Sequence, residues 1–188
     1  MNIVLASKSP RRKELLGLLD LDFQIITADI DETMNPTLPV ADEVMRLSLE
    51  KAAAIRPLVT NDTVIISADT VVELDGVVMG KPKDKADAFN MLKSLSGNTH
   101  NVLSGVTVMQ GDKHISKTVT TKVNFRTITD KEIHDYIETL EPMDKAGSYG
   151  IQGRGSKFVI GIVGDYFNVV GLPVCELSLM LKNFDINI

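Results

Sequence analysis

The chain has 188 residues, of which 44% are apolar and 24% are charged, and its formal net charge is −5. This composition is typical of a globular protein, and the acidic balance argues against a chain that coats nucleic acid. A single cysteine, Cys175, excludes an internal disulfide and a cysteine-rich metal site.

The first third of the chain alternates between strand and helix patterns. We predict strands over residues 3–6 and 22–30, helices over 10–19 and 40–55, and a polar loop over 31–39. Ser9 is a suitable N-cap for the first helix, and Pro10 suits its first position. An apolar stripe of Val44, Leu47 and Ile55 supports the second helix.

The rest of the chain adds two hairpins to this alternation. We predict hairpins over 63–80 and 101–128, helices over 84–97, 129–140 and 172–184, and a strand over 157–164. The hairpins turn at Asp75-Gly76 and Gly111-Asp112. Because hairpins interrupt a purely parallel pattern, we expect an α/β fold with a mixed sheet, in one domain over 1–188.

The segment "LASKSPRRKELL", residues 5–16, contradicts a local rule. Arg11, Arg12 and Lys13 occupy the first turn of a helix, where the helix dipole favours anions. The arrangement is favourable if a phosphate chain binds there, contacting the arginines and the hydroxyls of Ser7 and Ser9. The alternative is a solvated basic turn.

Asp69 interrupts the apolar run "VIISADTVVEL". A buried carboxylate is costly unless a cation, a metal or several donors compensate it, so this residue is a candidate for chemistry. The alternative is an aspartate whose partners are nearby backbone groups or Thr70.

Three weaker signals accompany Asp69. Lys51 lies beside the apolar stripe of its helix, and Lys81 follows a hairpin strand in "MGKPK". Either could be an ordinary surface lysine. The segment "KAGSYGIQGRG", residues 145–155, is rich in glycine, which permits close approach to a ligand but is also simply flexible. Together these features suit a metal-dependent reaction on a phosphate chain.

Three motifs resemble the Maf family of nucleoside triphosphate pyrophosphatases over essentially the whole chain. They are "LASKSPRRKELL", "SADTVVELDGVVMGKP" and "EPMDKAGSYGIQGRG", the last followed by "VVGLPV". The resemblance implies hydrolysis of a nucleoside triphosphate to the monophosphate and pyrophosphate. It also implies an elongated mixed α/β fold like that of the inosine triphosphatases, with a cleft between two lobes, and a homodimer.

The family pattern falls on individual residues of this chain. They are Ser7, Arg11, Arg12, Glu32, Lys51, Asp69, Lys81 and Gln152. Asp69 matches the proton acceptor, and a divalent ion, Mg²⁺ or Mn²⁺, would be held by Asp69 and Glu32. The resemblance alone favours Glu32 over Asp29 and Asp31 in the same loop.

Arg11, Thr70 and Gln152 match the branch of the family that acts on dTTP and UTP. A glutamine amide offers a donor and an acceptor, which suits the N3–H and carbonyl edge of uracil or thymine.

Other function classes remain as alternatives. One is a nucleotide-binding regulator of septum formation and cell division, and another is a purine-directed pyrophosphatase. Binding of nucleic acid is disfavoured because the chain is acidic and lacks a basic recognition helix. No signal peptide and no long apolar run is evident, so we expect a cytoplasmic protein without a membrane partner.

Overall fold

A computed structural model describes residues 2–188 of the chain, which folds into two compact units. Unit 1 comprises Met1–Asp69, Ser104–Val119 and Gly171–Ile188. Unit 2 comprises Thr70–Leu103 and Thr120–Val170. The boundary in the first hairpin strand separates Asp69 from Thr70, so the predicted site residues are divided between the units.

The strands form one mixed sheet, as predicted. Its strands are β1 (Ile3–Leu5), β2 (Gln24–Ile25), β3 (Val64–Leu74), β4 (Val77–Met79), β5 (Thr99–Gln110), β6 (Lys113–Phe125) and β7 (Val159–Val163). The order is β2-β1-β3-β5-β6-β7, with β4 paired to β3. β1 runs parallel to β2 and β3, whereas β4 and β7 run antiparallel to their partners. The mixed α/β fold class is therefore confirmed.

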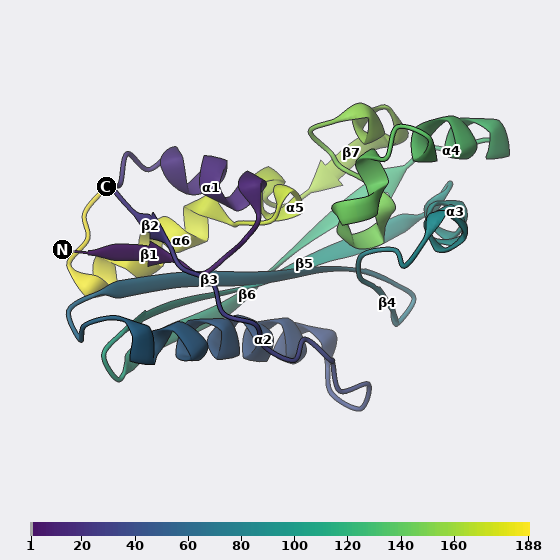
Figure 1. Ribbon diagram of the computed structural model, residues 1–188. Coiled ribbons are helices and arrows are strands. Elements are labelled where there is room, and N and C mark those ends of the chain that lie inside the picture. Colours follow the sequence, from purple (N-terminus) through teal and green to yellow (C-terminus); the bar gives the residue numbers. More distant parts are fainter. Residues whose placement is uncertain (1) are drawn as a thin grey trace. The chain divides into compact units, whose positions relative to one another are not determined.

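Unit 1 contains the long helix α2 (Val40–Ile55) and the helices α1 (Pro10–Gly17) and α6 (Val174–Leu181). α2 lies along one face of the strands, and α1 and α6 lie on the other (Figure 1). The α2 face contributes Ala52 and Ile55 to a core with Val4 and Ile65. Ile55 belongs to the stripe that predicted α2, and the bounds of this helix match the prediction.

Gly105 in β5 allows α2 to approach the sheet closely. A Cβ at this position would lie 2.0 Å from the carbonyl oxygen of Val44, in the first turns of α2. Real Cβ atoms do not approach so closely, so any larger residue must displace the helix. Glycine at this position therefore sets the distance between α2 and the strands.

Unit 2 contains α3 (Lys85–Leu95), α4 (Asp130–Ile137) and the short helix α5 (Tyr166–Val170). Its core brings together buried aromatic residues, among them Phe125, Tyr136, Tyr149 and Phe158. α4 begins with the expected capping box of Thr129 and Glu132. The Asp75-Gly76 turn of the first hairpin has positive φ at both residues, as this turn requires.

Several elements differ from the sequence predictions, and among them α1 ends at Gly17 and α4 at Ile137, two and three residues before their predicted ends. The second strand is confined to Gln24–Ile25, where both residues are exposed and lack the burial that a longer strand would need. α5 was not predicted, because five residues carry too little periodicity. The last helix continues beyond Leu181 only as a turn of 3₁₀ helix, Lys182–Phe184.

Among residues 2–188, none of the helices is sufficiently long and apolar to cross a membrane. The single domain and the cleft between lobes stay predictions.

Candidate active site

Asp69 is buried in a central strand, as predicted, and is joined to a lysine and a second carboxylate. Nζ of Lys51 lies 2.5 Å from Oδ1 of Asp69 and 3.0 Å from Oε1 of Glu32. The side chains of Lys51 and Asp69 are 14% and 10% exposed, whereas that of Glu32 is 61% exposed. One ammonium group therefore contacts two carboxylates. The cluster of these three side chains is buried at Asp69 and open to water at Glu32.

A hydrogen bond between α2 and β3 determines where Lys51 meets Asp69. Oγ of Ser67 donates to the carbonyl oxygen of Ser48 over 2.6 Å. Asp69 follows Ser67 by two residues on the same face of the strand, and Lys51 follows Ser48 by one turn of the helix. The register set by the two serines therefore places the lysine against the aspartate.

Glu32 lies in a loop that α2 itself holds in place. Glu43, whose side chain is 1% exposed, accepts a hydrogen bond from the backbone N of Asn35 over 2.6 Å. Arg46 donates to the carbonyl oxygen of Thr33 over 3.0 Å and forms an ion pair with Glu43. The bond from Arg46, with that from Asn35, lowers the pKa of Glu43 to about 2.

Sequence reasoning missed Glu43 and Arg46. The available signal was the position of Glu43 on the apolar stripe of α2, directly before Val44, where an unpaired carboxylate would be costly.

The other acidic residues of this region have different partners. Asp29 forms an exposed ion pair with Lys8 at 2.8 Å, and Asp31 accepts a hydrogen bond from the backbone N of Thr33 over 2.9 Å. Glu32, in contrast, contacts Lys51. Glu32 is therefore the acidic residue of the three that contacts Lys51, and its role in the site stays a prediction.

Hydrogen bonds at the start of α1 fix the guanidinium group of Arg12. Oγ of Ser7 accepts hydrogen bonds from the backbone N of Ser9 over 3.2 Å and from Nη1 of Arg12 over 3.3 Å. Nε of Arg12 donates to the carbonyl oxygen of Gly171 over 2.8 Å. Ser9 caps the helix, as predicted, by accepting from the backbone N of Arg12. The cation is therefore held in position by hydrogen bonds on both sides.

The charges around Arg12 connect the helix end to the carboxylates. Burial lowers the pKa of the Arg12 guanidinium, Asp69 and Glu32 raise it, Arg11 lowers it, and the net effect is a lowering. An arginine remains protonated despite such a shift. Arg12, Asp69 and Glu32 are therefore within electrostatic reach of one another in unit 1.

The remaining predicted residues belong to unit 2. Thr70 follows Asp69 in β3, and Lys81 lies exposed just after β4. Gln152 is exposed in the turn within the glycine-rich segment. The backbone N of Gly147, in that segment, donates to the carbonyl oxygen of Gly80 over 3.1 Å. Unit 2 thus connects the backbone beside Lys81 to the segment that carries Gln152.

The carboxylates fit a hard divalent cation only in part. Among residues 2–188, no group of three or more His, Cys, Asp or Glu side chains is arranged to hold a metal ion. Asp69 and Glu32 both reach one nitrogen, so two carboxylates converge on one point. Mg²⁺ is commonly bound by one or two carboxylates with phosphate oxygens and water, so this donor set suits an ion that arrives with a nucleotide.

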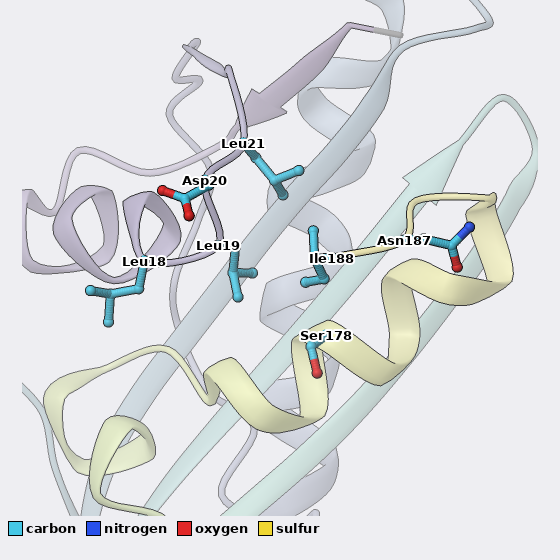
Figure 2. A pocket seen from close by; sticks show the side chains of 7 residues that line it. All are labelled: Leu18, Leu19, Asp20, Leu21, Ser178, Asn187 and Ile188. Atoms are coloured by element: carbon cyan, nitrogen blue, oxygen red, sulfur yellow. The ribbon is translucent and has the colours of Figure 1, made fainter.

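A separate hollow of unit 1 does not have this chemistry. Figure 2 shows its lining side chains, which come from the segment directly after α1, from α6 and from the last residues. They are Leu18, Leu19, Asp20, Leu21, Ser178, Asn187 and Ile188, around about 460 Å³. The lining holds leucines and a carboxylate but no cation, so it is unsuited to a triphosphate.

Residues 2–184 match the family model described as "Maf-like protein". The chain belongs to the Maf family. The "dTTP/UTP pyrophosphatase" of Bacillus cytotoxicus is 47% identical over 97% of this chain and 95% of the relative. The protein of the same name from Bacillus mycoides is 47% identical over the same shares.

A solved structure also resembles this Maf protein. It is a nucleoside-triphosphatase / dITP/XTP pyrophosphatase from Mycobacterium abscessus, with a TM-score of 0.43 and 14% identity, covering 68% of this chain and 76% of that one.

Proposed function

We propose that this Maf protein hydrolyses dTTP and UTP to the nucleoside monophosphate and pyrophosphate. The observation that carries the proposal is the cluster of Lys51, Asp69 and Glu32 within electrostatic reach of Arg12. Such a cluster combines carboxylates, which take up protons and bind cations, with fixed positive charges for phosphate oxygens. The names of relatives that are 47% identical over nearly the whole chain support the choice of substrate.

The phosphate chain binds at the start of α1. The guanidinium groups of Arg12 and Arg11 supply positive charge at this helix end. Oγ of Ser7 is an acceptor in both of its hydrogen bonds, so its own proton can be donated to a phosphate oxygen. The concentration of cations in this turn is therefore explained by a ligand that brings the negative charge.

The chemical step is attack of water on the α-phosphorus. A carboxylate oxygen of Asp69 accepts a proton from the attacking water as its oxygen forms the new bond to phosphorus. The bond from the α-phosphorus to the bridging oxygen breaks, and pyrophosphate leaves with both electrons of that bond. Lys51, Lys81 and Arg12 stabilise the charge that develops on the leaving group.

Asp69 and Glu32 would hold the divalent ion, Mg²⁺ or Mn²⁺. When bound, such an ion neutralises phosphate charge and polarises the phosphorus–oxygen bonds. Lys51 contacts both carboxylates before substrate arrives and keeps them close together. These two residues thus need no large rearrangement to meet an ion carried by the nucleotide.

The base is read by Gln152, with Thr70 and Arg11 as further determinants. The Gln152 amide donates to a carbonyl oxygen of uracil or thymine and accepts from N3–H, and cytosine offers no N3–H to this pair. The three roles come from the family resemblance.

A homodimer is also part of the proposal, and light scattering of the purified protein measures it directly.

The test is pyrophosphate release with Mg²⁺ or Mn²⁺ from dTTP, UTP, CTP, ITP, GTP and 7-methyl-GTP. We expect release chiefly from dTTP and UTP. For Asp69→Asn we expect the rate of pyrophosphate release to fall about 10²–10³-fold. Full turnover by a folded, metal-saturated Asp69→Asn protein would overturn the role of Asp69. Turnover centred on a purine would overturn the role of Gln152, and binding without turnover would identify a regulator instead.

A further inference from the structure

The turn that carries Gln152 is built around the carboxylate of Glu141. Oε2 of Glu141 accepts a hydrogen bond from the backbone N of Arg154 over 2.9 Å. Oε1 accepts from the backbone N of Gly155 over 3.2 Å and from Oη of Tyr136 over 2.9 Å. Three donors therefore converge on one side chain, and two of them belong to the segment that follows Gln152.

The segment that precedes Gln152 is held by the same group of side chains. Oη of Tyr136 accepts a hydrogen bond from the backbone N of Gly150 over 3.2 Å while it donates to Glu141. Tyr136 is 1% exposed, and burial raises the pKa of its hydroxyl, so the proton that it donates is retained. The backbone on both sides of Gln152 is thus hydrogen-bonded to the side chains of Tyr136 and Glu141, which also form a hydrogen bond with each other.

Glycine at position 153 is required by the proximity of the same carboxylate. A Cβ on Gly153 would lie 2.3 Å from Oε1 of Glu141 and 2.6 Å from its Cδ. The backbone next to Gln152 therefore packs directly against Glu141, with no space for a side chain between them. A movement of the carboxylate would be transmitted to Gln152 through a single residue.

Glu141 is charged in this environment. Burial raises the pKa of its carboxyl group, but the hydrogen bonds from Arg154, Tyr136 and Gly155 outweigh burial, and the net pKa is lowered. An ionised carboxylate offers acceptors on both oxygens and no donor, which matches the three donors around it.

We propose that Glu141 is a positioning residue that orients the Gln152 amide toward the edge of a uracil or thymine ring. This inference rests on the proposed function, because it presumes that Gln152 reads the base. Gln152 itself is exposed, and the backbone on which it stands sets where its side chain starts. Glu141 holds that backbone, and it thereby contributes to the choice among bases without touching the nucleotide.

Glu141→Gln is the informative substitution because it changes the hydrogen-bonding character and keeps the shape. An amide nitrogen in place of Oε2 would face the N–H of Arg154, and in place of Oε1 it would face the N–H of Gly155. In either orientation the amide nitrogen, a donor, faces a backbone N–H donor, so the turn must shift. Glu132→Gln is the matched control, since Glu132 caps α4 and pairs with Arg126 in the same unit.

The experiment measures kcat and KM for dTTP, UTP and CTP in Glu141→Gln, Gln152→Ala, the double variant and Glu132→Gln. For Glu141→Gln we expect KM for dTTP and UTP to rise about ten-fold with kcat within about two-fold. The preference over CTP should fall toward that of Gln152→Ala. In the Gln152→Ala background the second substitution should add nothing, because it acts through the residue already removed.

Each outcome has a separate meaning. Additive effects of the two substitutions would overturn the inference and leave the proposed function intact. So would an unchanged preference for dTTP and UTP over CTP in Glu141→Gln if Gln152→Ala lowers that preference. Wild-type protein that does not prefer dTTP and UTP over CTP would contradict the proposed function itself. If Glu141→Gln does not fold, Gly153→Ala, which places a methyl group against an intact Glu141, tests the same inference and should show the same change in preference.

Discussion

Lys51 of α2 and Asp69 of β3 meet at 2.5 Å, and this contact joins the helix to the strand at the candidate active site. The lysine also reaches Glu32, so it is the shared cation of two carboxylates. Each carboxylate is therefore compensated within the chain, and a cation that binds the oxygens contacted by Lys51 competes with the ammonium group.

Lys51→Met should bind Mn²⁺ more tightly than the wild-type protein does when nucleotide is absent. The substitution removes the ammonium that competes for Asp69 and Glu32, and it leaves two carboxylates that repel each other until a cation binds. Without metal, the variant should lose about 3 kcal/mol of stability, as expected when a buried ion pair loses one partner. Titration calorimetry with Mn²⁺ measures the first effect and urea unfolding the second. Equal or weaker Mn²⁺ binding by the variant would refute competition by Lys51.

Glu32→Gln should raise the concentration of Mg²⁺ needed for half-maximal pyrophosphate release and lower the maximal rate by about 10²-fold. The amide keeps the contact with Lys51 but is a poorer ligand for a hard cation than a carboxylate. Asp29→Asn, in the same loop, removes a charge whose partner is the exposed Lys8 and should behave as wild type. A similar Mg²⁺ requirement in both variants would argue against Glu32 as a metal ligand.

Gly105→Ala should destabilise the protein by at least about 2 kcal/mol, because the new methyl group would overlap the backbone of α2 at Val44. The displaced helix carries Lys51, so pyrophosphate release should fall as well. Gly17→Ala is the matched control in the same unit, since no atom lies within 4 Å of a Cβ there. Urea unfolding and activity at saturating substrate check both effects. Gly105→Ala protein with wild-type stability would show that the sheet does not limit the position of α2.

His100 should make the stability of the protein depend on pH. The ring is 2% exposed, its Nε2 lies 2.8 Å from Oη of Tyr149, and burial lowers the pKa of the ring from 6.5 to about 4. Between pH 6.5 and pH 4 the unfolded chain therefore binds a proton on His100 and the folded chain does not. The contribution of neutral His100 is complete above pH 6.5 and is lost as the pH falls to 4.

Between pH 7.5 and 5 this loss should reach about 2 kcal/mol in the free energy of unfolding. His100→Gln, which stays neutral, should remove that dependence. His134→Gln changes an exposed histidine of the same unit and should keep it. Urea unfolding at a series of pH values measures the slopes, and parallel curves for all three proteins would exclude His100 as the cause.

Most of the fold could be predicted from local patterns. The stripe of α2, the cap at Ser9 and the turn at Asp75-Gly76 each depend on residues close in sequence, and each was predicted correctly. The extent of the second strand was wrong because pairing at a sheet edge depends on burial by distant elements.

The site was less predictable than the fold. Asp69 could be recognised because a carboxylate within an apolar strand is conspicuous. Glu32 could not, because an acidic residue in a loop has the same appearance whether it faces water or Lys51. Glu43 and Glu141 were missed for a related reason, since each also binds backbone N–H groups of a loop that lies several residues away in the sequence.

The ammonium of Lys51 also separates folding from metal supply. Because Lys51 already neutralises the carboxylate buried in the sheet, the chain requires no ion to hold Asp69 in place. Under the proposed function, metal would then serve turnover and not the integrity of the fold. The protein should persist intact in metal-poor surroundings and regain activity when an ion returns with its nucleotide, so that a chelator acts as a reversible inhibitor and not as a denaturant.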